Sequence, residues 1–306
     1  MMIHVRKDYL HLGFTYVSAL VFVFVFVFAI QTYPNKEGGI LGEEKNTQQP
    51  PLFVNREAFE LLPITAKAYI VYDIVDKKVI ASHNSTTTLP LASLTKVMTA
   101  LTAHSVAPEA TLIRIEPGHI DGSYDLGLRK GQAWRLDELL KYTLTFSSND
   151  GAYAVADSLL GRREFIARMN TVAAGYGLDL VFTDPAGLDE GDVLGGKGSA
   201  YDVAVLMSIA RREIPGILEA TTKKRSTVMT ENGPLSGVPN TNQSVAGIIG
   251  IEGSKTGYTD LAGGNLALIA DVAVGHPVVI VVLGSTKAER FTDVEMLYEA
   301  LLVSLK

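Results

Sequence analysis

Residues 90–99 read PLASLTKVMT, and the apolar stretch after the proline predicts a helix over residues 92–106. Ser93 and Lys96 lie three residues apart in its first turn, which places both on one helical face within side-chain reach. Lys96 is the only charged residue between positions 91 and 101. Because lysine is rarely buried without a partner or a purpose, and burial disfavours its ammonium form, Lys96 is a candidate base toward the Ser93 hydroxyl. The alternative is a capping serine beside a lysine that reaches the surface.

Strands near both ends of the folded part of the chain enclose a helical middle. A hairpin is predicted at residues 67–83, where two alternating β-branched segments flank a polar turn. Further helices are predicted at 136–145, 152–160, 164–176, 200–212 and 288–305, and further strands at 225–230, 250–258, 265–274 and 277–284. The pattern predicts a mixed α/β (α+β) domain in which the terminal strands form one antiparallel sheet and the helices form an inserted lobe. A cleft between the two parts is the expected place for a site.

Two further polar motifs follow Ser93 and Lys96 along the chain. Residues Ser147 and Asn149 lie in a turn after a predicted helix, a setting in which such residues are common for structural reasons alone. Residues 255–257, Lys-Thr-Gly, lie within a predicted strand, where the glycine indicates a close approach of the backbone to a ligand. An exposed edge strand with a solubilising lysine is the alternative for this motif. Ser-x-x-Lys, Ser-x-Asn and Lys-Thr-Gly in this order form the signature of penicillin-binding proteins and class A β-lactamases.

At these residues the chain resembles the low-molecular-mass penicillin-binding proteins that act as serine-type D-alanyl-D-alanine carboxypeptidases. The resemblance runs from about Ala66 to Ser285 and includes sequence around the motifs at residues 90–99, 128–150, 169–202 and 253–263. It implies a penicillin-binding/β-lactamase-like fold and acyl transfer without a metal or cofactor. The implied partners are peptidoglycan stem peptides, with β-lactam antibiotics as covalent inhibitors.

The resemblance also implies a role for each motif residue. Ser93 would attack the carbonyl of the terminal D-Ala-D-Ala bond, and neutral Lys96 would take its proton. Ser147 would relay a proton to the departing amine, and Asn149 would hold the substrate amide.

The remaining implied roles belong to the strand motif. Lys255 would attract the terminal carboxylate of the substrate, and Thr256 would form a hydrogen bond with it. Gly257 and Tyr258 complete the substrate-binding strand, and the backbone N–H groups of Ser93 and Tyr258 would form the oxyanion hole.

The N-terminus predicts a membrane attachment. After the basic Arg6 and Lys7, an uncharged apolar run extends over residues 13–30, close to the length of a spanning helix, and no small-x-small cleavage pattern follows it. The basic residues before the run favour an internal N-terminus. We therefore expect a cytoplasmic stub at 1–12, a transmembrane anchor at 13–31, a flexible tether at 32–57 and an extracytoplasmic catalytic domain at 58–306, held at a bacterial cytoplasmic membrane.

Other functions remain possible on the same residues. A D,D-endopeptidase that cuts peptidoglycan cross-links would use them equally well. A serine β-lactamase shares the motifs, but no Glu-x-x-Leu-Asn segment lies between the second and third motifs, and Glu190 is the nearest substitute. An inactive wall-binding scaffold would be favoured by loss of Ser93, Lys96 or Lys255, and all three are present.

Composition limits the remaining classes. The chain is 47% hydrophobic and 20% charged, as in ordinary globular proteins. Its net charge of −6 argues against a nucleic-acid partner, which requires clustered basic residues. The absence of cysteine excludes a disulfide framework and a cysteine nucleophile.

Overall fold

The computed structural model describes residues 52, 54–120 and 127–305. The predicted stub and anchor, and the predicted tether up to residue 51, lie outside the described residues. Residues 54–57, the last of the predicted tether, already contact the folded unit, because Val54 pairs with Leu305 and the Asn55 N–H donates to the Ser304 carbonyl at 3.1 Å. None of the helices in the described part of the chain has both the length and the hydropathy of a membrane-spanning segment.

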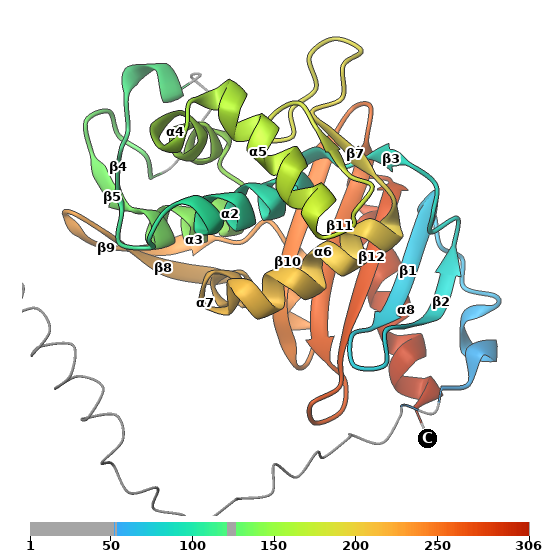
Figure 1. The fold of residues 1–306 in the computed structure, drawn as a ribbon. Helices are drawn as coiled ribbons and strands as arrows, with labels where there is room; N and C mark the ends of the chain where they lie inside the picture. The colour runs from blue at the N-terminus through green and yellow to red at the C-terminus, as the bar shows by residue number, and fades with distance from the viewer. Residues whose placement is uncertain (1–51, 53, 121–126, 306) are drawn as a thin grey trace, which may run out of the picture. The chain divides into compact units, whose positions relative to one another are not determined.

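The central feature is an antiparallel sheet built from the two ends of the folded unit (Figure 1). Among the described residues it has five strands in the order β10-β11-β12-β1-β2. Their bounds are β1 Ala68–Asp73, β2 Lys78–His83, β10 Ile251–Thr259, β11 Gly263–Asp271 and β12 Pro277–Ser285. Every neighbouring pair is antiparallel, which confirms the predicted sheet of terminal strands.

Strand β12 explains why the sheet is covered on both faces. Its central residues are β-branched or leucine and are fully buried, with no polar alternation. Val279, Val281 and Leu283 belong to one hydrophobic cluster, whereas Val278, Ile280 and Val282 belong to a second. Because successive strand residues point to opposite faces, the two clusters are the two cores on either side of the sheet.

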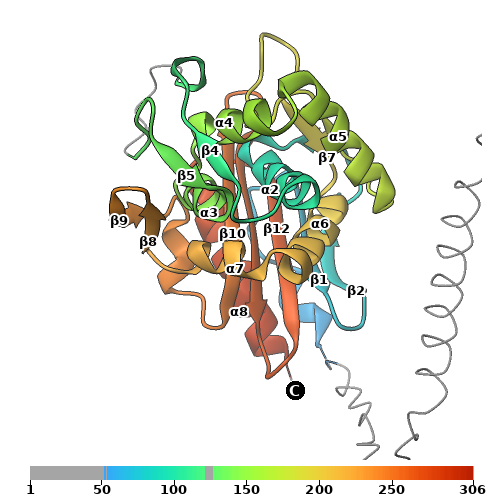
Figure 2. The same ribbon diagram turned by 60° about the vertical axis from the view of Figure 1, so that its left-hand side comes forward.

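Helices cover both faces. The first cluster contains residues of α2 (Thr95–Val106) and α6 (Ala200–Glu213), which lie in front of the sheet in Figure 2. The second contains residues of α8 (Glu289–Ser304). The helical lobe adds α3 (Leu136–Phe146), α4 (Asn149–Leu159), α5 (Arg162–Gly175) and the single turn α7 (Pro215–Leu218).

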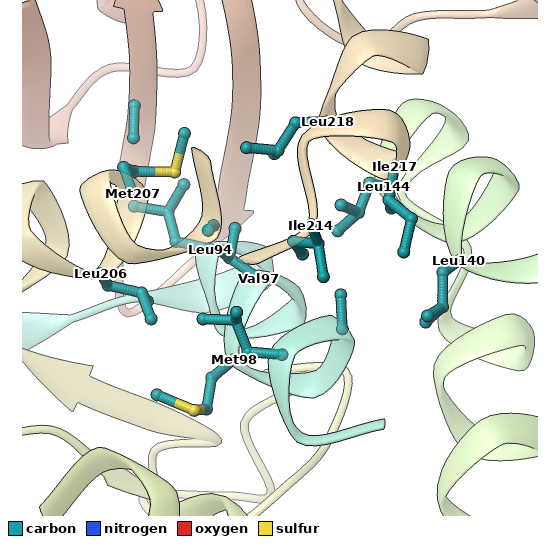
Figure 3. Packing of buried hydrophobic residues seen from close by; sticks show 14 of the residues in the cluster. Leu94, Val97, Met98, Leu140, Leu144, Leu206, Met207, Ile214, Ile217 and Leu218 are labelled. Atoms are coloured by element: carbon teal, nitrogen blue, oxygen red, sulfur yellow. The ribbon is translucent and has the colours of Figure 1, made fainter. Parts of the chain in front are cut away.

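Helix α2 lies at the centre of the first core. Figure 3 shows Leu94, Val97 and Met98 packed among apolar side chains from the elements around them. The labelled neighbours are Leu140 and Leu144 of α3, Leu206 and Met207 of α6, and Ile214, Ile217 and Leu218 at and around α7. A helix enclosed on so many sides fixes the position of any polar group in its first turn.

The short elements depart most from the sequence prediction. The predicted strand at 225–230 is β8 (Arg225–Thr230). Six other strands of the described residues were not predicted: β3 Leu89–Pro90, β4 Leu112–Arg114, β5 Ala133–Arg135, β6 Val181–Phe182, β7 Gly196–Gly198 and β9 Gly233–Pro239. Strands of two or three residues are too short to show an alternating pattern. Prolines at both ends of the β9 segment also argued against a strand there.

The helix predicted at 92–106 begins as a 3-10 turn, η2 (Ala92–Leu94), before α2. The other 3-10 turns are η1 Arg56–Phe59, η3 Pro117–His119, η4 Glu219–Thr222 and η5 Gln243–Ala246.

Candidate active site

Ser93 and Lys96 form a close polar pair at the start of α2. The Lys96 Nζ lies 2.7 Å from the Ser93 Oγ, and the lysine side chain has no exposed surface. Nζ also lies 2.7 Å from the Asn149 Oδ1 and 2.7 Å from the Ala186 carbonyl oxygen, and it donates to both. These two oxygens can only accept hydrogen bonds, whereas a serine hydroxyl can donate. In its neutral form, the Lys96 amine would direct its two N–H groups to these fixed acceptors and its lone pair to the Ser93 hydroxyl.

The backbone around Ser93 is held in an uncommon conformation. Ala92 has φ of +49°, a left-handed value that a residue with a Cβ adopts only when its surroundings impose it. The Leu91 N–H donates to the Gly196 carbonyl at 2.8 Å, and the Asn265 Nδ2 donates to the Pro90 carbonyl at 2.9 Å. These bonds fix the chain immediately before the nucleophile turn to β7 and β11.

Two glycines allow other segments to approach this turn. A Cβ at Gly187 would lie 2.1 Å from the Ala92 carbonyl oxygen, and one at Gly257 would lie 2.8 Å from the Leu91 carbonyl oxygen. Gly257 therefore lets β10 pass against the residues just before α2, so the close approach is to another segment of the chain, whereas the sequence predicted one to a ligand. Gly187 lets the loop that carries the Ala186 carbonyl do the same from the other side.

Ser147 and Lys255 join the helical lobe to the sheet. Ser147 follows the last residue of α3 in a left-handed conformation with φ of +65°, and its Oγ accepts a hydrogen bond of 2.8 Å from the Lys255 Nζ. Lys255 also donates to the Thr256 carbonyl at 2.9 Å. Ser148 caps α4 by accepting from the Gly151 N–H, which places Asn149 in the first turn of that helix, facing Lys96.

The electrostatic environment of Lys255 is unusual. Burial lowers the pKa of the Lys255 ammonium well below its ordinary value of 10.5, and the charge that Lys96 carries when protonated and the Arg290 guanidinium lower it further. The hydrogen-bond partners of its Nζ, Ser147 and Thr256, are neutral. An anion bound beside Lys255 would offset this positive charge.

Three groups that the sequence did not single out complete the site. Arg290 of α8 is buried, and its Nη1 donates to the Gly257 carbonyl at 2.7 Å. The Thr241 and Thr256 hydroxyls are 2.6 Å apart. The third group is the Ala186 carbonyl, whose loop is fixed by Asp184, which accepts from the Ala186 N–H at 2.8 Å. A backbone carbonyl leaves no side-chain signal, and Arg290 lies among the ordinary charges of an amphipathic helix.

Tyr258 differs from the other predicted residues. Its side chain is 39% exposed, and its hydroxyl donates to Asp260 at 3.1 Å, which raises the tyrosine pKa. Any role of Tyr258 in the site is therefore one for its backbone N–H group.

The structure brings the other predicted side chains together in two adjacent hydrogen-bonded groups. These are Ser93–Lys96–Asn149 and Ser147–Lys255, with Thr256 and Gly257 next along β10.

The model of the Peptidase S11 family, described as D-alanyl-D-alanine carboxypeptidase, matches residues 55–287. The D-alanyl-D-alanine carboxypeptidase DacF of Bacillus subtilis is 29% identical over 237 residues, which are 75% of this chain and 60% of that protein. The D-alanyl-D-alanine endopeptidase of Haemophilus influenzae is 29% identical over 215 residues, 67% of this chain and 70% of that protein. The chain thus spans less than two thirds of the length of DacF.

Among solved structures, penicillin-binding protein D2 from Listeria monocytogenes in its ampicillin-bound form has a TM-score of 0.69 and 29% sequence identity. The match covers 78% of this chain and 98% of that one. This agreement confirms the penicillin-binding type of fold that the motif order predicted.

The close contact at Gly187 leads to a stability prediction. Gly187→Ala places a Cβ against the Ala92 carbonyl at φ of +77° and should lower the free energy of unfolding by about 2–4 kcal/mol. Gly191→Ala is the matched control, because Gly191 in the same loop also has positive φ but no atom near its Cβ, and it should cost about 1 kcal/mol. Chemical denaturation of the two variants measures the difference, and equal costs would contradict the packing role of Gly187.

The lowered pKa of Lys255 leads to a pH prediction. Between that lowered pKa and 10.5, the unfolded chain holds a proton on Lys255 that the folded chain lacks, so the free energy of unfolding rises as the pH rises. The slope from this group is at most about 1.4 kcal/mol per pH unit. Lys255→Met should remove that part of the slope, as measured by denaturation at a series of alkaline pH values. An identical slope in both proteins would show that Lys255 titrates normally.

Proposed function

The chain belongs to the Peptidase S11 family of D-alanyl-D-alanine carboxypeptidases, and we propose that it removes the terminal D-Ala from peptidoglycan stem pentapeptides through an acyl-enzyme on Ser93. The observation that carries this proposal is the 2.7 Å contact between the Ser93 hydroxyl and a fully buried lysine amine. A hydroxyl is a weak nucleophile until a neighbouring base accepts its proton.

In the first half of the reaction, the Ser93 Oγ attacks the carbonyl carbon of the penultimate D-Ala while Lys96 accepts the hydroxyl proton. The developing oxyanion is stabilised by the backbone N–H groups of Ser93 and Tyr258, a contribution of roughly 3 kcal/mol per donor in other acyl-transfer enzymes. The carbon–nitrogen bond then breaks, and the departing amine of D-Ala takes, by relay through Ser147, the proton that Lys96 accepted, which leaves Lys96 neutral again. Lys96 then takes a proton from the attacking water and passes it to the Ser93 Oγ as the ester bond breaks, which frees the shortened peptide and restores the Ser93 hydroxyl.

Substrate capture follows from the groups on β10. The terminal carboxylate of the stem peptide lies beside the Lys255 ammonium and the Thr256 hydroxyl, where it offsets the surrounding positive charge. Its arrival favours the protonated form of Lys255, which keeps its proton while it holds the carboxylate and donates a hydrogen bond to the Ser147 Oγ. Since the Oδ1 of Asn149 accepts from Lys96, its Nδ2 is the atom that donates to the substrate amide carbonyl.

β-Lactam antibiotics are the covalent inhibitors that this site would accept. Their carboxylate and strained amide present the same two groups to Lys255 and Ser93 as the natural substrate. The ampicillin-bound structure of the Listeria protein supports this inference by its likeness in fold and sequence.

The proposed location is the outer face of a bacterial cytoplasmic membrane. Residues 13–31 would hold the chain in the bilayer as a single anchor, and the tether that follows would connect it to the catalytic domain. The apolar run at residues 13–30 and the basic residues before it support this proposal.

A second candidate function is D,D-endopeptidase cleavage of peptidoglycan cross-links. The observation that favours it is the Haemophilus relative of that name, which matches at the same 29% identity as DacF. The bond that is cut and the residues required are alike in the two reactions. The β-lactamase alternative has less support, because Glu190, its nearest candidate for deacylation, lies exposed in a turn and pairs with Val193.

The assignment of Ser93 is tested by the variant Ser93→Ala. We expect D-Ala release from a soluble pentapeptide to fall by at least about 1,000-fold, because the acyl-enzyme has no other oxygen on which to form. Ser82→Ala is the control, since Ser82 belongs to a second Ser-x-Asn pattern in the chain but lies exposed on β2. Full D-Ala release by Ser93→Ala would refute the mechanism.

The same proteins distinguish the two reactions when they are incubated with intact sacculi. A carboxypeptidase converts pentapeptide stems to tetrapeptides and leaves cross-linked dimers in place. A loss of dimers that depends on Ser93 would instead assign the endopeptidase activity.

A further inference from the structure

Large apolar side chains are exposed at one end of the sheet. Val274, in the turn between β11 and β12, is 95% exposed, and Ile249, just before β10, is 80% exposed. Val303, in the last turn of α8, is 82% exposed. In Figure 1 the β11–β12 turn and the C-terminal end of α8 both lie at the lower end of the molecule. Apolar residues that protrude together from a soluble domain often mark an interaction surface.

Hydrogen bonds connect the segments that carry these residues. The Asp271 N–H donates to the Gly250 carbonyl at 2.8 Å, which joins the segment of Ile249 to the start of the turn that contains Val274. The Tyr298 hydroxyl donates to the Ile249 carbonyl at 2.9 Å and joins the same segment to α8, one helical turn before Leu302.

The turn between β1 and β2 lies beside them. The Ile74 N–H donates to the Pro277 carbonyl at 3.2 Å, and the next residue, Val75, is partly exposed. We call the surface formed by Val75, Ile249, Val274, Leu302 and Val303 the apolar end.

The chain enters the folded unit at this same end. Val54 pairs with Leu305, and the Asn55 N–H donates to the Ser304 carbonyl, so the first described residues lie against the last turn of α8. The sequence before them contains the apolar run of residues 13–30. A membrane that holds this run would therefore be reached from the apolar end of the domain.

We propose that the apolar end rests on the lipid bilayer in which residues 13–31 are anchored, with its protruding side chains inserted among the lipid headgroups. This inference rests on the membrane anchor proposed above. It extends that proposal, because the catalytic domain itself would be bound to the membrane surface and would not move freely at the end of its tether. Aliphatic side chains at a protruding turn are suited to the boundary between headgroups and acyl chains.

The charges around the apolar end indicate what kind of lipid it contacts. Lys77 lies in the β1–β2 turn, and Lys78, the first residue of β2, is paired with Asp76 at 3.1 Å. The outer side of α8 carries Glu295 and Glu299. Since both signs are present, the contact depends on apolar insertion and not on attraction to anionic lipid, so zwitterionic vesicles should support it.

Docking would fix the height of the catalytic site above the lipid. Strand β10 runs from the apolar end toward the nucleophile turn, and Thr256 is five residues beyond Ile251, a distance of about 17 Å along a strand. A flexible tether of the predicted length would otherwise let the domain move over roughly 25 Å. The docked domain would therefore meet the stem peptides closest to the membrane.

The experiment uses the full chain, which has no native cysteine. Ile249→Cys and Val274→Cys are each labelled with an environment-sensitive fluorophore and reconstituted into phosphatidylcholine vesicles that contain a spin-labelled quencher lipid. Leu112→Cys is the matched control, because Leu112 is also an exposed apolar residue, at 70%, but lies on β4 in the helical lobe. We expect at least twofold quenching at positions 249 and 274 and none at position 112.

Two further readouts make each outcome decisive. Vesicle flotation tests the anchor alone, and D-Ala release from soluble pentapeptide tests the proposed enzyme and the integrity of the labelled proteins. Chains that float but show equal, weak quenching at all three positions would overturn the docking and leave the anchor standing. Chains that do not float would overturn both. Protection of positions 249 and 274 that depends on protein concentration and not on the quencher lipid would assign the surface to a second copy of the chain.

Discussion

An amine held away from water, one helical turn from a serine hydroxyl, is the constraint on which the rest of the site depends. Lys96 has no exposed surface, so its Nζ must find its hydrogen-bond partners within the protein. Asn149 supplies one acceptor from α4 and Ala186 another from a loop that follows β6. The third neighbour is the Ser93 Oγ, which, unlike the Asn149 Oδ1 and the Ala186 carbonyl oxygen, carries a hydrogen that it can donate. Desolvation thus determines both the packing around the first turn of α2 and the chemistry that the turn supports.

The sheet provides the second half of the site by its topology. Strand β12 carries a core on each face, and this lets α2 pack on one side of the sheet while α8 packs on the other. Strand β10, at the edge, brings Lys255 to Ser147 of the helical lobe, and α8 places Arg290 against the Gly257 carbonyl. Burial and the neighbouring positive charge lower the pKa of Lys255 at this place. In the proposed reaction the substrate carboxylate would offset that charge, so substrate recognition and electrostatic balance would depend on the same groups.

The sequence predicted the parts of this arrangement that leave a local signal. A single lysine in an apolar helix, a lysine and a glycine within one strand and the order of the three motifs were sufficient to single out Ser93, Lys96 and Lys255 as candidates, and the structure places them close together. The antiparallel sheet was predicted from strand patterns near both ends of the folded part of the chain. Other features required the tertiary structure. The Ala186 carbonyl carries no side-chain signal, Arg290 resembles any surface cation of α8, and the left-handed conformation of Ala92 is imposed by Gly196, Asn265 and Gly187 from distant segments.

The rate at which Ser93 is acylated in a Lys96→Met variant tests the central claim most directly. Methionine fills a similar volume without an amine, so the folded chain, verified by its unfolding transition, should be acylated by labelled penicillin about 100- to 10,000-fold more slowly than the unaltered protein. An acylation rate within threefold of that of the unaltered protein would show that the Ser93 hydroxyl is activated by a group other than the buried amine beside it.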